Sequence, residues 1–378
     1  MTKKVLVSVL LVGSLSFAAC STAAEEGISN SGSAEAAGTG TEAAEEDSTS
    51  VSTGEIESLD KLDLSEFSEA PTMTDYIPED ADTSGTKEDG SKWKIAWLNP
   101  DMSDESMAYM TKAMTEKGEE YGIDLVSYDA QGDPQKQTDQ INSSISQDVD
   151  AIVINPIDPP SAVPAMKKAR EAGIVVINGQ NITNDPDSYD CYIGPDDKQA
   201  GQIAASMVMD KYPDGAKIVM VDGLAGSTAQ INRTKGFRGV LESHPEYEIL
   251  DEQAATNWSG ADAMNIMDPF LSKYPDIDVC FCQWDMGTVS CIQSAESVDR
   301  ADEITFVSVD GQQVALDQIA EGGCFYGTAM QDFNAASEMQ IMTALAFLNG
   351  DGDKIQKENY PDYVAITKDN ASNFEAGW

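Results

Sequence analysis

The chain has 378 residues, with 66 Asp and Glu against 23 Lys and Arg, and its formal net charge at pH 7 is −43. So acidic a protein is not expected to bind nucleic acid or an anionic membrane surface through charge. Its one histidine, His244, leaves no room for a multi-histidine metal site or a serine–histidine hydrolase pair, and we expect neither metal nor cofactor.

The first twenty residues have the pattern of an export signal. Lys3 and Lys4 supply positive charge, an apolar run covers residues 5–19, and small residues precede Cys20. The run is too short for a finished membrane-spanning helix. It resembles a bacterial lipoprotein signal, which implies that Cys20 is lipidated and becomes the mature amino terminus. The alternative is an ordinary secretory peptide with an incidental cysteine. Either interpretation predicts work outside the cytoplasm, and the first predicts anchoring at the outer face of the cytoplasmic membrane.

Residues 21–92 are predicted to be an acidic, disordered linker. They are rich in Ser, Thr, Ala, Gly, Glu and Asp and nearly free of aromatic residues. Such a composition buries too little apolar surface to offset chain ordering, and its charges repel one another.

From residue 93 onward, short apolar runs alternate with amphipathic helical stretches. Helical spacing is clear at Ile141, Ile145 and Val149. The pattern is typical of parallel sheets with both faces covered, and about 285 residues exceed one comfortable core. We therefore predict an α/β fold with two lobes. The predicted strands cover residues 94–98, 124–128, 151–155, 175–178, 217–222, 278–283, 305–310 and 325–330.

Candidate ligand-binding residues follow these runs, because open α/β sheets bind ligands beyond the carboxyl ends of their strands. Amides and carboxylates can meet the hydroxyls of a sugar or polyol, and an indole can cover an apolar sugar face. The alternative interpretation is that Asp and Asn cap the following helices. Asp310 is the strongest candidate, since it ends an apolar strand directly. From these positions the predicted site comprises Asp104, Ser106, Gln180, Asn181, Trp258, Trp284, Asp310 and Gln331.

The cysteines beyond Cys20 show no recognised disulfide or zinc spacing. Cys280 and Cys282 lie two apart in an apolar run, so on a strand they face the same way. Buried free thiols are the favoured interpretation, and a single disulfide is the alternative. The remaining three are Cys191, Cys291 and Cys324.

Several motifs in series resemble the ribose- and galactose-type periplasmic binding proteins of ABC importers. They are Asp-Ala-Gln-Gly-Asp-Pro-Gln-Lys-Gln at 129–137, Val-Asp-Ala-Ile-Val-Ile-Asn-Pro at 149–156, Arg-Thr-Lys-Gly-Phe at 233–237 and Val-Asp-Gly at 309–311. The resemblance implies two Rossmann-like lobes with parallel sheets joined by a three-strand hinge, the type 1 periplasmic binding protein fold. Its crossings would lie near Pro195, Gln331 and Thr367, giving lobes of 93–194 plus 332–366 and 195–331 plus 367–378.

By the same resemblance, the protein would capture a monosaccharide-like ligand between its lobes and deliver it to an ABC importer permease. We expect a monomer, because the linker and the closing cleft need no symmetric assembly. We expect no enzymatic activity, because no carboxylate pair stands out by context. A sensor that docks to a chemoreceptor or kinase is the alternative. The resemblance adds Met107 to the predicted site, and the resulting nine residues take the family's contact positions. Ile231 stands where the family has a ligand-facing arginine, and Arg233 matches a structural one. The resemblance therefore implies a neutral, aromatic pocket without arginine.

Overall fold

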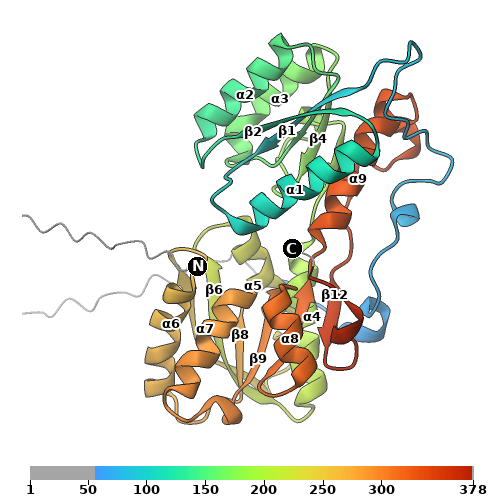
Figure 1. Ribbon diagram of the computed structural model, residues 1–378. Coiled ribbons are helices and arrows are strands. Elements are labelled where there is room, and N and C mark those ends of the chain that lie inside the picture. Colours follow the sequence, from blue (N-terminus) through green and yellow to red (C-terminus); the bar gives the residue numbers. More distant parts are fainter. Residues whose placement is uncertain (1–55, 377–378) are drawn as a thin grey trace, which may run out of the picture. The chain divides into compact units, whose positions relative to one another are not determined.

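The computed structural model describes residues 56–376, so Cys20 and the predicted export signal lie outside the described residues. Two six-stranded sheets organise the chain (Figure 1). The first has the order β11–β5–β4–β3–β1–β2 and the second the order β12–β10–β9–β8–β6–β7. The pairings are parallel, except that β12 runs antiparallel to β10. This confirms the predicted α/β fold with two parallel sheets.

All eight predicted strands are present. The strands of the first sheet are β1 (Lys94–Asn99), β2 (Asp124–Asp129), β3 (Ala151–Ile154), β4 (Val175–Gly179), β5 (Cys191–Ile193) and β11 (Glu358–Asn359). Those of the second are β6 (Ala216–Leu224), β7 (Tyr247–Ala255), β8 (Val279–Cys282), β9 (Thr305–Asp310), β10 (Phe325–Met330) and β12 (Val364–Thr367). The sequence did not predict β5, β7, β11 or β12. β7, β11 and β12 lie at sheet edges, and β5 has only three residues, so none of the four requires a long apolar run.

Each sheet is buried on both faces, which explains the near-continuous apolar strands. Successive side chains of β1 alternate between two cores, with Ile95 and Trp97 in one cluster and Ala96 and Leu98 in the other. On the first sheet, α1 (Glu105–Glu120) and α9 (Phe333–Leu348) cover one face, while α2 (Pro134–Ser146) and α3 (Pro159–Glu171) cover the other.

The second sheet is covered in the same way. On one face, α4 (Asp197–Lys211) and α5 (Thr228–Leu241) pack against side chains of β6 and β8. The other face carries α6 (Gly260–Lys273), α7 (Asp285–Glu296) and α8 (Gln313–Glu321). Each sheet with its helices forms one lobe, called below the first lobe and the second lobe.

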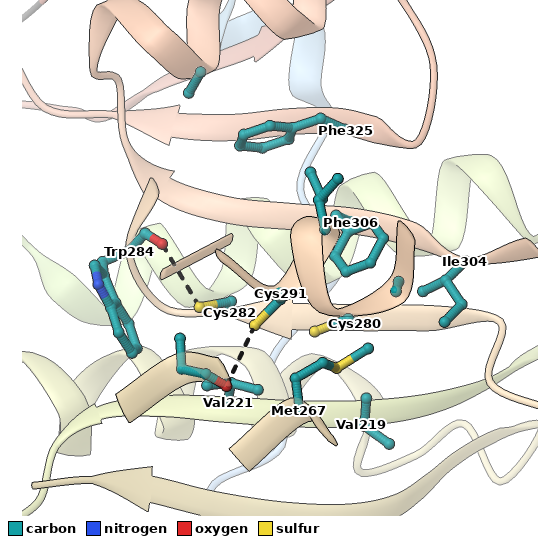
Figure 2. Close-up of a cluster of buried hydrophobic side chains, with 14 of the residues drawn as sticks. Val219, Val221, Met267, Cys280, Cys282, Trp284, Cys291, Ile304, Phe306 and Phe325 are labelled. Atoms are coloured by element: carbon teal, nitrogen blue, oxygen red, sulfur yellow. Dashed lines mark hydrogen bonds between the residues drawn. The ribbon is translucent and has the colours of Figure 1, made fainter. Parts of the chain in front are cut away.

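The cysteines are packing residues. Cys280 and Cys282 lie on the same face of β8, as predicted, and Cys291 of α7 packs beside them in an apolar cluster (Figure 2). These three and Cys191 are buried free thiols, while Cys324 is half-buried and also free. Burial raises the pKa of Cys191 to about 12, which keeps its thiol protonated and unreactive.

The chain passes between the lobes at three short crossings. The first follows β5 at 194–196, and the second lies between β10 and α9 at 331–332. The third lies at 360–363, between β11 of the first sheet and β12 of the second. The predicted third crossing near Thr367 is wrong, because Val364–Thr367 pairs with β10 and fills the edge of the second sheet. Residues 364–366 therefore belong to the second lobe.

Residues 56–92 differ from the predicted disordered linker. They lie against both lobes, include the short helical turns Leu64–Phe67 and Met73–Asp75, and leave Ile77 only 2% exposed. The acidic average composition of residues 56–92 obscured the apolar side chains, such as Phe67 and Ile77, that pack against the cores of the two lobes. Among residues 56–376, no helix has the length and hydropathy needed to cross a bilayer.

Candidate functional site

A cavity of about 670 Å³ lies between the two lobes, at the carboxyl ends of strands from both sheets. All nine side chains predicted from the sequence line this cavity. The first lobe contributes Asp104, Ser106, Met107, Gln180 and Asn181. The second lobe contributes Trp258, Trp284 and Asp310, and the second crossing contributes Gln331. Strand ends that are distant in sequence meet here because parallel strands present their carboxyl ends at one edge.

Asp310 is held in place by its buried neighbour Asp285. The Asp285 carboxylate accepts hydrogen bonds from the backbone N–H of Gly311 at 2.8 Å and of Gln312 at 2.7 Å. It also accepts from the hydroxyls of Ser308 and Thr328. These bonds hold the turn after β9, in which Asp310 has a φ of 132°. Such a conformation is strained for a non-glycine residue and persists only where its surroundings impose it.

Arg233 also lines the cavity, which corrects the expectation of a pocket without arginine. Its Nε donates to Asp197 Oδ1 at 2.9 Å, and its Nη1 donates to the Gln283 carbonyl at 2.6 Å and to Asp310 Oδ1 at 3.3 Å. The family resemblance assigned Arg233 a structural role and therefore did not predict that it lines the cavity. Its spacing from the Lys-Gly-Phe motif nevertheless fixes its place on α5.

The charged groups around Arg233 shift one another's pKa values. Burial raises the pKa of Asp310 to about 8, although the positive charge of Arg233 opposes the rise. Burial alone would lower the pKa of Arg233, but the neighbouring Asp197 and Asp310 hold it above the usual range. The guanidinium therefore stays charged, and it donates hydrogen bonds to carboxyl groups on two sides within the protein.

A polar network joins the cavity to all three crossings. The Tyr363 hydroxyl, in the third crossing, lies 3.1 Å from Asp197 Oδ1 and 3.2 Å from Gln331 Oε1. Gln331, in the second crossing, donates through Nε2 to Gln180 Oε1 of the first lobe at 3.0 Å. Asp197 follows the first crossing directly. Groups that line the cavity are thus hydrogen-bonded to the segments that connect the two lobes.

Two tryptophans form an aromatic corner on the second lobe. The rings of Trp258 and Trp284 meet edge to face, with centroids 5.5 Å apart and an interplanar angle of 88°. A Cβ at Gly223 would come within 1.9 Å of the Trp258 ring, and one at Gly287 within 2.3 Å of the Trp284 ring. Both rings therefore depend on glycines beneath them. Figure 2 shows Trp284 at the margin of the apolar cluster of the second lobe.

On the first lobe, Asp104 serves as the N-cap of α1. Its Oδ1 accepts from the backbone N–H of Ser106 at 2.9 Å and of Met107 at 3.2 Å, and from the Ser106 hydroxyl at 2.6 Å. The capping interpretation therefore holds for Asp104. Met107 is 8% exposed and belongs to both the core and the cavity wall.

The turn after β4 is built by Asn178. Its side chain donates to the carbonyls of Gly179 and Asn181 and accepts from the backbone N–H of Thr183. Gln180 within this turn has a positive φ of 44°. Asn181 is fixed further, because its Nδ2 donates to the Pro156 carbonyl at 3.0 Å. The turn thus presents two amides to the cavity in a defined orientation.

Three cavity side chains carry a buried polar atom without a hydrogen-bond partner among residues 56–376. They are Gln180 Nε2, Trp284 Nε1 and Gln312 Oε1. Buried polar atoms are normally paired, so each marks a place where an additional group could act. Gln312, Asn155 and Phe333 were not among the predicted site residues. Of these three residues, only Asn155 could have been predicted to line the cavity, because it lies directly after β3.

Within the described part of the chain, no cluster of three or more His, Cys, Asp and Glu residues is placed to hold a metal ion.

Comparison with known proteins agrees with this architecture. The family model for the periplasmic binding protein domain matches residues 95–352. A xylitol-binding protein of Mycolicibacterium smegmatis is 31% identical over 251 residues, which cover 66% of this chain and 70% of that protein. A ribose import binding protein of Bacillus subtilis is 25% identical over 212 residues, covering 56% of this chain and 68% of that protein.

Solved structures are similar as well. An ABC transporter solute-binding protein from Bacillus halodurans, with bound myo-inositol, superposes with a TM-score of 0.68 at 26% identity. The superposition covers 79% of this chain and 99% of that protein.

Proposed function

Because this chain belongs to the periplasmic binding protein family, whose related members are sugar- and polyol-binding proteins of ABC importers, we propose that it captures a sugar or polyol of monosaccharide size between its lobes. We further propose that it delivers this ligand to an importer permease. The observation that carries the first proposal is the cavity of about 670 Å³, in which tryptophan rings and hydrogen-bonding side chains from both lobes face one space. Its size is ordinary for a small-molecule site.

The side chains favour a ligand rich in hydroxyls. Gln180 and Trp284 offer unpartnered N–H donors, while Gln312 offers an acceptor. A hydroxyl can both donate and accept, so a polyhydroxylated molecule can satisfy all three. The face of Trp258, which is half-buried, can cover the apolar side of a sugar or the carbon chain of a polyol.

The charges favour a neutral ligand. Arg233 is the one cationic side chain that lines the cavity within the described residues, and Asp197 and Asp310 already pair with it. A sugar acid would have to compete with these carboxyl groups for the guanidinium, and it would also meet Asp101 and Asp104 on the first lobe.

Capture follows from contacts to both lobes. A ligand favours a closed arrangement only through interactions that the closed form makes better than the open form. Asn181 and Gln180 approach from the first lobe, whereas Trp258 and Asp310 approach from the second. A ligand between them would link the lobes, and the closed protein would present a surface assembled from both to the permease.

A thermal-shift panel tests the binding proposal. Pentoses, hexoses, pentitols, inositols and amino acids are added to the protein without its export signal. At a hundred times the dissociation constant, a ligand adds about 2.7 kcal/mol of stability. For a chain of this size the melting temperature should rise by several degrees, at roughly 2–4 °C per kcal/mol.

The expected result is a rise with one class of sugar or polyol that is lost in Asp310→Ala and in Trp258→Ala. A response only to amino acids, or the same rise in both variants, would refute the assignment of the ligand or of the site.

We propose that the protein is a monomeric lipoprotein anchored through Cys20 at the outer face of the cytoplasmic membrane. The basis is the sequence pattern of residues 3–20. Anchoring would keep the binding protein at a high local concentration near its permease.

A further inference from the structure

Residues 56–92, called here the strap, precede the part of the chain that the family model matches. In Figure 1 the strap is the blue segment that passes from the second lobe to the first. Its two halves are anchored on different lobes, and only residues 69–71 join them. The strap is thus a fourth connection between the lobes, in addition to the three crossings of the fold.

The first half of the strap is anchored on the second lobe. The Leu59 N–H donates to the Gly239 carbonyl of α5 at 2.9 Å, and the Leu62 N–H donates to the Ser206 hydroxyl of α4 at 2.9 Å. Lys61 pairs with Asp210 of α4. The apolar side chains of this half pack against the core that α4 and α5 share with the sheet; they are Leu59, Leu62, Leu64 and Phe67.

The second half is anchored on the first lobe. Ile77 is 2% exposed and belongs to the core beneath α1 and α9. Asn349, at the end of α9, donates through Nδ2 to the carbonyls of Asp82 at 3.2 Å and Ser84 at 2.9 Å. Lys87 donates to Asp150 Oδ1 at 2.7 Å. These contacts fix the strap from residue 77 to residue 87.

Two glycines show that the fit is close on both lobes. A Cβ at Gly239 would lie 2.7 Å from the Glu57 carbonyl oxygen and 2.7 Å from Leu59 Cδ1. A Cβ at Gly85 of the strap would lie 1.8 Å from the Tyr121 carbonyl oxygen at the end of α1. The backbone of the strap therefore lies directly against the backbone of each lobe. A loosely attached tail would not need glycines at these two positions.

The middle of the strap lies at the hinge. Pro71 lines a small cavity together with residues of all three crossings: Pro195, Gln331 and Tyr363. The Tyr76 hydroxyl accepts a hydrogen bond from the Asp362 N–H of the third crossing at 3.3 Å. The Ser68 carbonyl accepts a hydrogen bond from Asn370 of the second lobe, and Thr72 directly precedes Met73, which packs against the core of the first lobe. Ser68 and Thr72 are joined by three residues and cannot separate by more than about 14 Å.

We propose that the strap limits the rotation of the two lobes about the hinge and so sets the range of cleft openings available before ligand binds. A rotation that separates Ser68 from Thr72 beyond the reach of residues 69–71 must first undock one anchored half. The strap therefore acts as a restraint whose strength is that of its weaker anchor. This inference does not depend on the identity of the ligand.

The experiment measures the distance between spin labels at Asp139→Cys on α2 and Asn265→Cys on α6, which are exposed positions on the two lobes. The protein starts at residue 21 and carries Cys324→Ser, while the buried thiols remain. In the test variant, a Gly-Ser spacer of about 12 residues, with an r.m.s. span of about 20 Å, is inserted between Ala70 and Pro71. No ligand is added.

The matched control carries the same spacer between Asp89 and Gly90, an exposed turn that leaves the short connection at 69–71 intact. We expect the distance distribution to broaden and shift with the spacer at Ala70, and to stay unchanged with the spacer at Asp89. Identical distributions in all three proteins, or equal broadening by both spacers, would overturn the proposal.

A second variant guards against a folding failure of the first. Leu59→Ala with Leu62→Ala leaves the chain length unchanged but weakens the anchor on the second lobe, and it should broaden the same distribution. An unchanged distribution would again contradict the restraint. Because these measurements use the ligand-free protein, the absence of sugar binding would refute the proposed function and leave the strap inference standing.

Discussion

At the scale of single residues, Asp285 and Asp310 show how position divides the roles of two carboxylates. Asp285 is fully buried and accepts four hydrogen bonds, which hold the turn after β9. Burial raises its pKa to about 6 against these donors. Asp310, presented by that turn, faces the cavity and Arg233. Asp285 is thus a positioning residue, and Asp310 is the residue available to a ligand.

The pKa of Asp310 leads to a prediction about pH. Burial raises this pKa from 3.8 to about 8, so a growing share of Asp310 becomes protonated as the pH falls from 9 to 5. The ionised carboxylate accepts more hydrogen bonds than the protonated acid, and affinity for the sugar or polyol should therefore fall over this range. Calorimetric titration from pH 5 to pH 9 measures the profile. In Asp310→Asn it should be weaker and nearly flat; parallel profiles would exclude Asp310 as the titrating group.

The same shift has a defined sign for stability. Between pH 3.8 and about 8 the folded protein binds more protons at Asp310 than the unfolded chain does. The contribution of this residue to the free energy of unfolding therefore decreases as the pH rises through that window. Asp310→Asn should remove this part of the pH dependence in denaturant titrations.

At the scale of elements, α1 begins at the cavity, and its N-cap is also a candidate ligand contact. Asp104 uses one oxygen for the first turn of the helix, while the residue as a whole lines the cavity. Capping and binding can be separated, because a serine also caps helices but is too short to reach as far as an aspartate.

We expect Asp104→Ala to lower the free energy of unfolding by about 1 kcal/mol through loss of the cap, and Asp104→Ser to lower it far less. Both variants should bind the ligand more weakly. Denaturant titration and calorimetry on the same preparations separate the two effects. Unaltered affinity in Asp104→Ser would mean that Asp104 serves only the helix.

At the scale of the whole molecule, two sheets present their strand ends to one cavity, and three crossings and the strap connect them. The network from Arg233 through Asp197, Tyr363 and Gln331 to Gln180 ties the cavity to these crossings. A ligand that rearranges any of these bonds acts on the hinge directly. This coupling is a property of the assembled lobes and of no single element.

Membrane attachment also belongs to this scale. We expect cells that express the protein to incorporate radiolabelled palmitate into it and to retain it in the membrane fraction. Cys20→Ala should abolish labelling and release the protein, because one missing thiol removes the only attachment point that the signal offers. Labelling that persists in Cys20→Ala would contradict the lipoprotein proposal. The ligand-binding variant Trp258→Ala should be labelled normally.

Much of this architecture was predictable from local pattern. Strands buried on both faces, such as β1 and β8, show as apolar runs, and polar residues directly after them indicate the cavity edge. The edge strand β7 was not predicted because Glu248, Asp251 and Glu252 interrupt its apolar residues. The cavity position of Arg233 was not predicted, because its place on a helix does not indicate which side chains it contacts. Its partners Asp197 and Asp310 are 36 and 77 residues away in sequence.

The sequence by itself determined the alternation of strands and helices, the free buried thiols on β8 and the set of polar and aromatic side chains at the strand ends. These features depend on the spacing of apolar residues and on residues adjacent in sequence, and both are visible in the sequence itself. Only the tertiary structure decided that Arg233 enters the cavity, that β12 joins the second sheet, and that residues 56–92 bind both lobes. Each of these depends on surfaces formed by residues far apart in the chain, such as the backbone at Gly239 that receives Leu59.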